Sequence, residues 1–159
     1  MRRTIRISLA RQALDLVDDD IVVRTYPVST SKFGAGERSG SHRTPRGRHL
    51  IRAKIGAGQP LGAVFRGRRP TGEVHDEALA REFPERDWIL TRILWLSGTE
   101  IGKNRLGDVD TMRRYIYIHG APDSDPMGVP GSIGCVRMSN SDVVDLFDQV
   151  DVGMVVTIG

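Results

Sequence analysis

Cys135 is the single cysteine among 159 residues, and it stands 16 residues after a histidine–glycine pair, His119-Gly120. A lone cysteine has no disulfide partner in its own chain, and one thiolate rarely holds a metal by itself. Two roles remain for it, a small buried apolar residue or a nucleophile. A free thiol has a pKa of about 8.5 and is mostly protonated at neutral pH, so a nucleophilic cysteine needs a base. His119 is the candidate base.

The backbone around Cys135 suits acyl transfer. Gly134 allows a substrate to approach closely, and the amides of Gly134 and Cys135 are candidate donors to a tetrahedral oxyanion, each contributing about 3 kcal/mol. An imidazole base also needs an acceptor that orients it, and the carbonyl of Gly120 is placed to serve. The loop between the two, residues 121–131, contains three prolines and two glycines and is long enough to fold one over the other.

A metal site is not indicated. His42, His49 and His75 show no paired ligand spacing, and the chain has no second cysteine. We therefore expect no metal site.

The elements that position these residues are mostly strands. Ile5, Ile7 and Leu9 alternate with polar residues, Leu14 and Leu16 resume the pattern, and residues 21–26 form a β-branched run after an aspartate turn. This pattern predicts a meander of strands.

Further strands are expected over residues 49–55, after the turn at residues 44–47, and over residues 88–96, 113–118 and 151–158. Because side chains alternate between the two faces of a strand, His119 should lie at the end of the strand over 113–118, on the same face as Tyr115 and Tyr117. Either tyrosine can add a hydroxyl to the site.

Two helices are expected. A short one falls within residues 74–85, in an insertion near the active face. The clearer one follows the capping residues 139–142, because Val143, Leu146, Phe147 and Val150 recur at helical spacing. The sequence therefore predicts one domain over residues 1–159 that is mainly β, as two packed sheets or a barrel-like sandwich with one or two short helices.

Composition excludes several partners. The net charge is +3, and only three of the 23 basic residues are lysines. The arginines form no helical stripe and are not interleaved with aromatic residues, so nucleic-acid binding is not expected, although arginine suits anionic partners. The N-terminus lacks the apolar centre of a signal peptide, and no apolar run is long enough to span a membrane. Taken as complete, the chain is expected to be cytoplasmic, unless a leader was removed.

Together these residues resemble the L,D-transpeptidase (YkuD-type) catalytic domain family. The family has a His-Gly pair, a loop of about a dozen residues, and then Ser/Thr-His-Gly-Cys-x-Arg/Asn. Here His119-Gly120 and eleven loop residues precede Ser132-Ile133-Gly134-Cys135-Val136-Arg137. Residues 7–14, 22–30 and 44–47 are similar to the family's opening hairpin, second strand and Thr-Pro-x-Gly turn, so the likeness covers nearly the whole chain.

The resemblance implies a role for each matching residue. Cys135 corresponds to the nucleophile, His119 to its activating imidazole, and Gly120 to the residue whose carbonyl orients that imidazole. Ser132 and Gly134 shape the nucleophile loop. Arg137 matches the polar residue that supports this loop or meets a substrate carboxylate, and we add Tyr117 as a substrate contact. Ile133 departs from the family, which usually has histidine there.

The resemblance also implies a reaction. The thiolate attacks the carbonyl between the diamino acid at position three of a peptidoglycan stem and the terminal D-alanine. D-Alanine leaves, and an amine of a neighbouring stem resolves the thioester to give a 3→3 cross-link. Carbapenem-type β-lactams are expected as covalent inhibitors, and we expect a monomer. The resemblance implies no metal and no organic cofactor. The family's substrate would place the protein in the periplasm or cell envelope.

Three alternatives stay open. If water resolves the thioester, the same site is an L,D-carboxypeptidase. The second alternative is another cysteine acyl-transfer enzyme or amide hydrolase on the same scaffold. The third is a catalytically silent domain that binds stem peptides.

Overall fold

Three antiparallel strands at the N-terminus form the predicted meander. They are β1 (Arg3–Ser8), β2 (Ala13–Asp18) and β3 (Ile21–Pro27) in a computed structural model that describes residues 2–159. In β1, Ile5 and Ile7 are buried while Arg6 between them is exposed, as the alternation predicts. β2 lies between β1 and β3 and is buried along most of its length, with Leu14 and Leu16 in the main core, whereas β3 forms an exposed edge.

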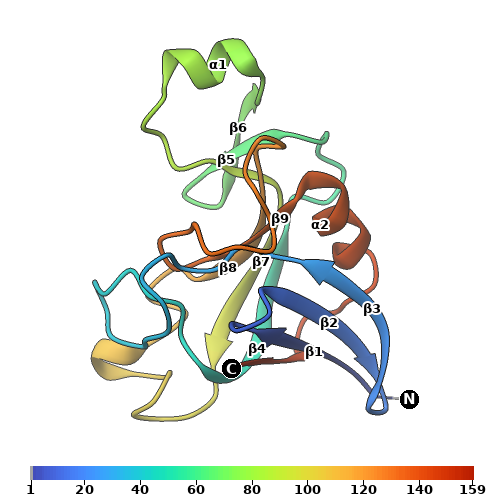
Figure 1. The fold of residues 1–159 in the computed structure, drawn as a ribbon, viewed down its shortest axis with the longest axis vertical. Helices are drawn as coiled ribbons and strands as arrows, with labels where there is room; N and C mark the ends of the chain where they lie inside the picture. The colour runs from blue at the N-terminus through green and yellow to red at the C-terminus, as the bar shows by residue number, and fades with distance from the viewer. Residues whose placement is uncertain (1) are drawn as a thin grey trace.

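The remaining strands continue the same sheet. They are β4 (Gly47–Ile55), β5 (Ala63–Arg66), β6 (Arg69–Val74), β7 (Ile89–Gly98), β8 (Tyr117–Ala121), β9 (Val136–Ser139) and β10 (Val155–Ile158). The order is β3-β2-β1-β10-β4-β7-β5-β6, with β8 paired to β7 and β9 to β8. Figure 1 shows the sheet curling into a half-barrel. The prediction of a mainly β fold is confirmed. Of the two predicted arrangements, the barrel-like one is correct, because the ten strands of the described range share one hydrogen-bonded sheet.

The main core lies between this sheet and helix α2 (Asn140–Phe147). Ser139 caps the helix by accepting a hydrogen bond from the amide of Asp142, as the capping pattern predicts. Val143, Leu146 and Phe147 are buried against the sheet, and Val150 packs in the same core from just beyond the helix end. This packing fixes the strand that precedes the helix, β9, against its neighbour β8.

A second part of the chain projects from the main body. Strands β5 and β6 and helix α1 (Glu77–Glu82) form the green extension at the top of Figure 1. The short helix was predicted, and Asp76 caps it. The two strands were not predicted, because β5 is only four residues long and β6 contains Pro70 and Gly72.

Two predicted strands start later than expected. Residues 111–115 form turns rather than strand, because Asp110 accepts hydrogen bonds from the Arg113 and Arg114 amides through its side chain and carbonyl. Tyr115 adopts a left-handed conformation with φ of 56°. The last strand begins at Val155, because a turn closed by the Met154 amide and the Asp151 carbonyl precedes it.

Candidate active site

Cys135 and His119 lie on neighbouring parallel strands. In the β8–β9 pair Ile118 lies opposite Val136, and His119 lies opposite Arg137, with Cys135 immediately before β9. Ile118 and Val136 belong to the main core. Because side chains alternate along a strand, His119 and Cys135 project from the other face of the sheet. His119 is the third residue of β8, so the prediction that it lies at a strand end is wrong, although its shared face with Tyr117 is correct.

The Cys135 thiol is half-buried between two backbone groups. Its Sγ donates to the carbonyl of Tyr115 at 3.4 Å and accepts from the amide of Tyr117 at 3.3 Å. The side chain also packs against a small buried cluster formed by Ala63, Phe65, Ile93 and Tyr117. Burial raises the pKa of Cys135 to about 12, against the smaller lowering by the Tyr117 amide. The thiol is therefore protonated at neutral pH, and its use as a nucleophile requires a base that removes the proton.

His119 has the features of such a base. The ring is 1% exposed, and its Nδ1 lies 2.6 Å from the carbonyl oxygen of Gly120, the acceptor that the sequence suggested. Burial lowers the pKa of His119, so the imidazole is neutral at neutral pH. Since a carbonyl can only accept, Nδ1 carries the proton and Nε2 keeps its lone pair.

Ser132 braces the segment that carries the thiol, residues 132–135, called the thiol segment below. Its hydroxyl accepts from the Gly134 amide at 3.2 Å and donates to the Cys135 carbonyl at 2.6 Å. Thr44 donates to the Gly134 carbonyl at 3.0 Å. Gly134 has φ of +134°, a conformation that favours glycine, and an added Cβ would lie 3.3 Å from a methyl of Ile116. The Gly134 amide, expected as an oxyanion donor, is thus hydrogen-bonded to Ser132 in this structure.

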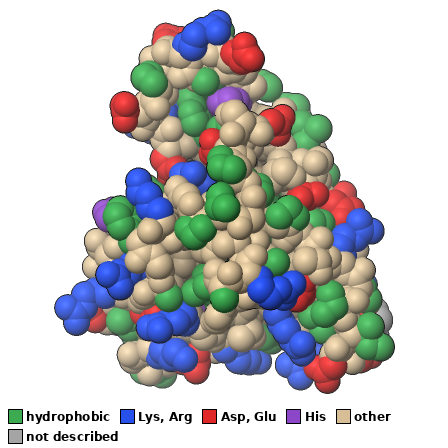
Figure 2. All heavy atoms as spheres, viewed as in Figure 1, with side chains coloured by type: hydrophobic (Ala, Val, Ile, Leu, Met, Phe, Trp, Pro, Cys, Tyr) green, Lys and Arg blue, Asp and Glu red, His purple; other side chains and the backbone are tan. Residues whose placement is uncertain are grey.

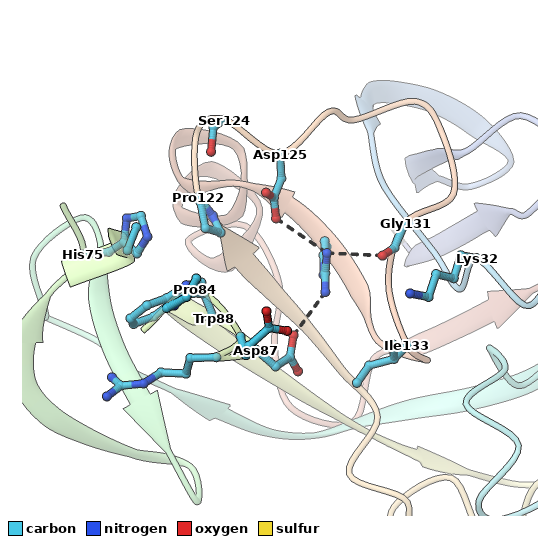
Figure 3. A pocket seen from close by; sticks show the side chains of 14 residues that line it. Lys32, His75, Pro84, Asp87, Trp88, Pro122, Ser124, Asp125, Gly131 and Ile133 are labelled. Carbon is cyan, nitrogen blue, oxygen red and sulfur yellow. Dashed lines mark hydrogen bonds and ion pairs between the residues drawn. The ribbon is translucent and has the colours of Figure 1, made fainter. Parts of the chain in front are cut away.

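Arg137 is already paired with two carboxylates. Its guanidinium lies 3.1 Å from Asp87 and 3.5 Å from Asp125, and it donates to the Gly131 carbonyl at 3.4 Å (Figure 3). Asp87 precedes β7, and Asp125 lies in the loop between β8 and β9. Arg137 therefore ties both segments to the strand that follows the thiol.

Tyr117 is buried and has an arginine partner that the sequence did not reveal. The Tyr117 hydroxyl accepts from Arg68 at 2.9 Å. The Arg68 guanidinium carbon also lies 4.7 Å from the ring centre of Trp95 and 4.8 Å from that of Tyr115. Tyr115 reaches Arg68 from its turn, so the prediction that it shares a strand face with Tyr117 is wrong.

An open cavity of about 500 Å³ adjoins the thiol segment. Ile133 and Arg137, two residues before and two after Cys135, both line it, and the side chain of Ile133 is 45% exposed. Part of the opposite wall, residues 84–88, follows α1, so the insertion does reach this face. Figure 2 shows the extension overhanging the main body.

Residues 2–159 hold no group of three or more His, Cys, Asp or Glu side chains placed to bind a metal ion. None of the helices in this range is long and apolar enough to cross a membrane.

Similar folds occur among solved structures. An L,D-transpeptidase from Mycobacterium smegmatis is 18% identical with a TM-score of 0.59, covering 99% of this chain and 58% of its own. An L,D-transpeptidase from Xylanimonas cellulosilytica is 23% identical with a TM-score of 0.54, covering 99% and 60%. L,D-transpeptidase 3 from Mycobacterium tuberculosis, in complex with a faropenem-derived adduct, is 16% identical with a TM-score of 0.59, covering 98% and 59%.

The chain thus spans about three fifths of the length of these structures. A comparison with curated proteins gave no match. The model of the YkuD family, described as the L,D-transpeptidase catalytic domain, matches residues 2–158. The chain therefore belongs to the YkuD family of L,D-transpeptidase catalytic domains.

Proposed function

We propose that this domain is a cysteine-dependent L,D-transpeptidase that acts on peptidoglycan stem peptides. Cys135 is the nucleophile, and His119 is its base. The observation that carries this proposal is the placement of both side chains on the same face of adjacent strands, with the Nδ1 of His119 held by Gly120. That hydrogen bond leaves Nε2 as the basic atom of a neutral ring.

The reaction begins with transfer of the Cys135 proton to Nε2 of His119. The sulfur then attacks the carbonyl between the diamino acid and the terminal D-alanine of a tetrapeptide stem, which gives a tetrahedral oxyanion. The Cys135 amide is the candidate donor to this oxyanion, because the Gly134 amide is bound to Ser132. The C–N bond breaks, D-alanine leaves with the proton from the imidazolium, and a thioester remains on Cys135.

The high pKa of the buried thiol fits this order of events. A thiol that stays protonated until a substrate arrives reacts slowly with oxidants and alkylating agents, because the thiolate is the reactive form. The neutral His119 beside it supplies the base only within the site. We propose an amine of a second stem as the acceptor that resolves the thioester.

A covalent inhibitor tests the proposal. The M. tuberculosis neighbour carries a faropenem-derived adduct, so we expect Cys135 to be acylated by meropenem. Intact-mass measurement should show one adduct on the wild type and none on Cys135→Ala. If a folded wild-type protein forms no adduct at any pH, the hypotheses that the domain is a cysteine-dependent enzyme are excluded.

The stem peptide itself distinguishes the outcomes of the thioester. A tetrapeptide is incubated with and without an amine acceptor, and released D-alanine is measured. Release that depends on the acceptor indicates a transpeptidase. Equal release in its absence indicates an L,D-carboxypeptidase, and no release with retained peptide binding indicates a silent binding domain.

A further inference from the structure

The loop between β7 and β8, residues 99–116, presents two apolar side chains to solvent. Ile101 is 73% exposed and Leu106 is 43% exposed, and an isolated bridge pairs Ile101 with Arg105 near the tip of the loop. Single exposed apolar residues are common on protein surfaces, so exposure alone indicates no partner. These two residues differ in the structure that holds them and in the charges around them.

Buried polar side chains hold this loop in place. Asn104 is fully buried and donates to the carbonyls of Arg46 and Arg48 at 3.1 and 3.0 Å. The carboxylate of Asp110 accepts from the Leu106 amide at 2.7 Å. Because these hydrogen bonds are internal to the protein, the loop is fixed with its two apolar side chains directed outward.

A pocket of about 250 Å³ beside the loop carries an excess of positive charge. Three exposed arginines line it, Arg52, Arg105 and Arg113. Within the described residues 2–159, none of the three forms an ion pair with a carboxylate. Asp110 also lines the pocket, but its carboxylate accepts hydrogen bonds from the backbone amides of Leu106 and Arg113. The pocket can therefore attract anions.

The exposed carboxylates of the same loop have other partners. Glu100 lies 3.8 Å from Lys103, and Asp108 lies 3.9 Å from Arg38. Figure 1 places the loop at the lower end of the main body, away from the projecting extension. Figure 2 shows Lys and Arg side chains gathered along this lower end. Exposed apolar side chains and unpaired arginines thus lie together at one end of the molecule.

We propose that this end of the domain docks on an anionic lipid membrane. The three arginines of the pocket bind lipid phosphates, and Ile101 and Leu106 enter the headgroup layer. A purely anionic partner would leave both apolar side chains in water, whereas a lipid surface has an apolar layer directly beneath its phosphates. None of the described residues that line the pocket is aromatic, so nucleic acid bases have no side chain there on which to stack.

This inference goes beyond the proposed function, because it concerns where the domain binds and not the reaction. Docking also orients the candidate active site. From Arg113 in the pocket, the chain continues through Tyr115, whose carbonyl accepts from the Cys135 thiol, into β8. The thiol is thus held at a fixed height above the lipid.

Vesicle binding tests the proposal. Co-sedimentation of the wild type is measured with vesicles of phosphatidylglycerol and phosphatidylcholine in equal parts, and with vesicles of phosphatidylcholine alone. We expect binding to the anionic vesicles only, and we expect this binding to weaken as salt is added, since exposed charges are screened. Equal binding to both kinds of vesicle, or binding to neither, would overturn the proposal.

Variants assign the contacts. Arg105→Gln and Arg113→Gln should each weaken binding to the anionic vesicles about fivefold, the usual contribution of one basic residue near an anionic surface. Ile101→Gln should weaken it about tenfold through lost apolar burial. Arg81→Gln and Leu61→Gln change exposed residues of the same kinds away from this loop, and they should bind as the wild type does. If the loop variants also bind as the wild type does, the proposal is wrong.

A fluorescent label separates insertion into lipid from attraction by charge alone. Ile101→Cys is combined with Cys135→Ala, so that the label has a single thiol to react with. The emission of a polarity-sensitive label should shift to the blue on anionic vesicles and stay unchanged with inorganic polyphosphate. Bound protein without this shift, or an equal shift with polyphosphate, would overturn the proposal. The labelled protein lacks the proposed nucleophile, so the outcome does not depend on the proposed function.

Discussion

Arg68 donates a hydrogen bond of 2.9 Å to the hydroxyl of Tyr117, joining the β5–β6 hairpin to the strand beside the thiol. Both tyrosines that contact Arg68 also frame the sulfur, through the Tyr115 carbonyl and the Tyr117 amide. The hairpin thus holds the two backbone groups that position the Cys135 thiol. Arg68 is a positioning residue, because it reaches the sulfur only through these tyrosines.

Removal of this link should slow acylation. We expect Arg68→Ala to reduce the second-order rate constant for acylation by meropenem by about tenfold, measured by intact mass, since a bond to a charged donor contributes roughly 1.5–3 kcal/mol. Tyr117→Phe should produce a similar loss, and the double variant should lose little more than either. Arg66→Ala, an exposed arginine of the same hairpin, serves as the control. Fully additive losses would show that the two residues act separately.

The assignment of His119 as the base predicts a larger loss of acylation rate than the loss of Arg68. His119→Ala should reduce the acylation rate by about 10²- to 10⁴-fold, the usual contribution of a general base. The exposed His42, changed to asparagine because its φ is 58°, is the control and should keep the wild-type rate. A His119→Ala rate within a few-fold of wild type would assign the base elsewhere.

The burial of the Cys135 thiol predicts that its rate of alkylation depends steeply on pH. Because burial raises the pKa of Cys135 to about 12, the thiolate fraction of the free protein should rise throughout the range from pH 7 to pH 11. Alkylation by iodoacetamide should therefore increase about tenfold per pH unit. The measurement is the rate of mass increase in the folded protein. A plateau below pH 9 would mean that the site stabilises the thiolate.

His49 predicts a loss of stability in acid. Burial lowers the pKa of His49 to about 4, below its ordinary value of about 6.5, while Gly47 and Thr111 hold both ring nitrogens. Between these values the unfolded chain binds a proton that the folded protein does not, so stability falls as the pH falls. This residue should account for about 2 kcal/mol between pH 7 and pH 5.

Urea unfolding at both pH values measures this loss. His119 contributes in the same direction, since its pKa is also lowered by burial, so the test is the difference between the wild type and His49→Gln. The variant should lose less stability between pH 7 and pH 5 than the wild type. Equal losses would show that His49 does not titrate in this way.

Ser132 offers a test of the bracing of the thiol segment. Ser132→Ala removes both hydrogen bonds of the buried hydroxyl, leaving the Gly134 amide and the Cys135 carbonyl without this partner. The free energy of unfolding should fall by about 1–3 kcal/mol. Thermal or urea unfolding gives this value, and Ser141→Ala, at the start of α2, is a comparison that keeps the loop intact. An unchanged unfolding free energy would contradict a bracing role for this hydroxyl.

The sequence predicts best those candidate residues that lie on strands with a clear alternating pattern. It pairs Cys135 with His119 because a lone thiol needs a base, and an alternating strand pattern points its residues to defined faces. Arg68 could not be found, since its hairpin is short and polar and its tyrosine partner lies 49 residues away. The two carboxylates on Arg137 were missed as well, because Asp87 lies 50 residues away and Asp125 lies in a loop whose course no strand or helix pattern defines.

Local hydrogen bonds explain the misplaced strand. Residues 113–116 have the composition of a strand, but Asp110 offers acceptors to the Arg113 and Arg114 amides and holds this stretch in turns. The later start of β8 moves Tyr115 out of the strand. It also places the Tyr115 carbonyl where it accepts from the thiol.

The parallel pairing of β8 with β9 has a consequence for how such a protein can change. The proposed nucleophile Cys135 and its proposed base His119 are spaced by the ladder between two strands, whereas the loop of residues 122–131 and the projecting extension shape the cavity. Under the proposed function, substitutions in the loop and the extension change which substrate fits while the spacing of Cys135 and His119 is kept. Substrate choice and bond formation would then evolve separately, because they depend on different parts of the chain.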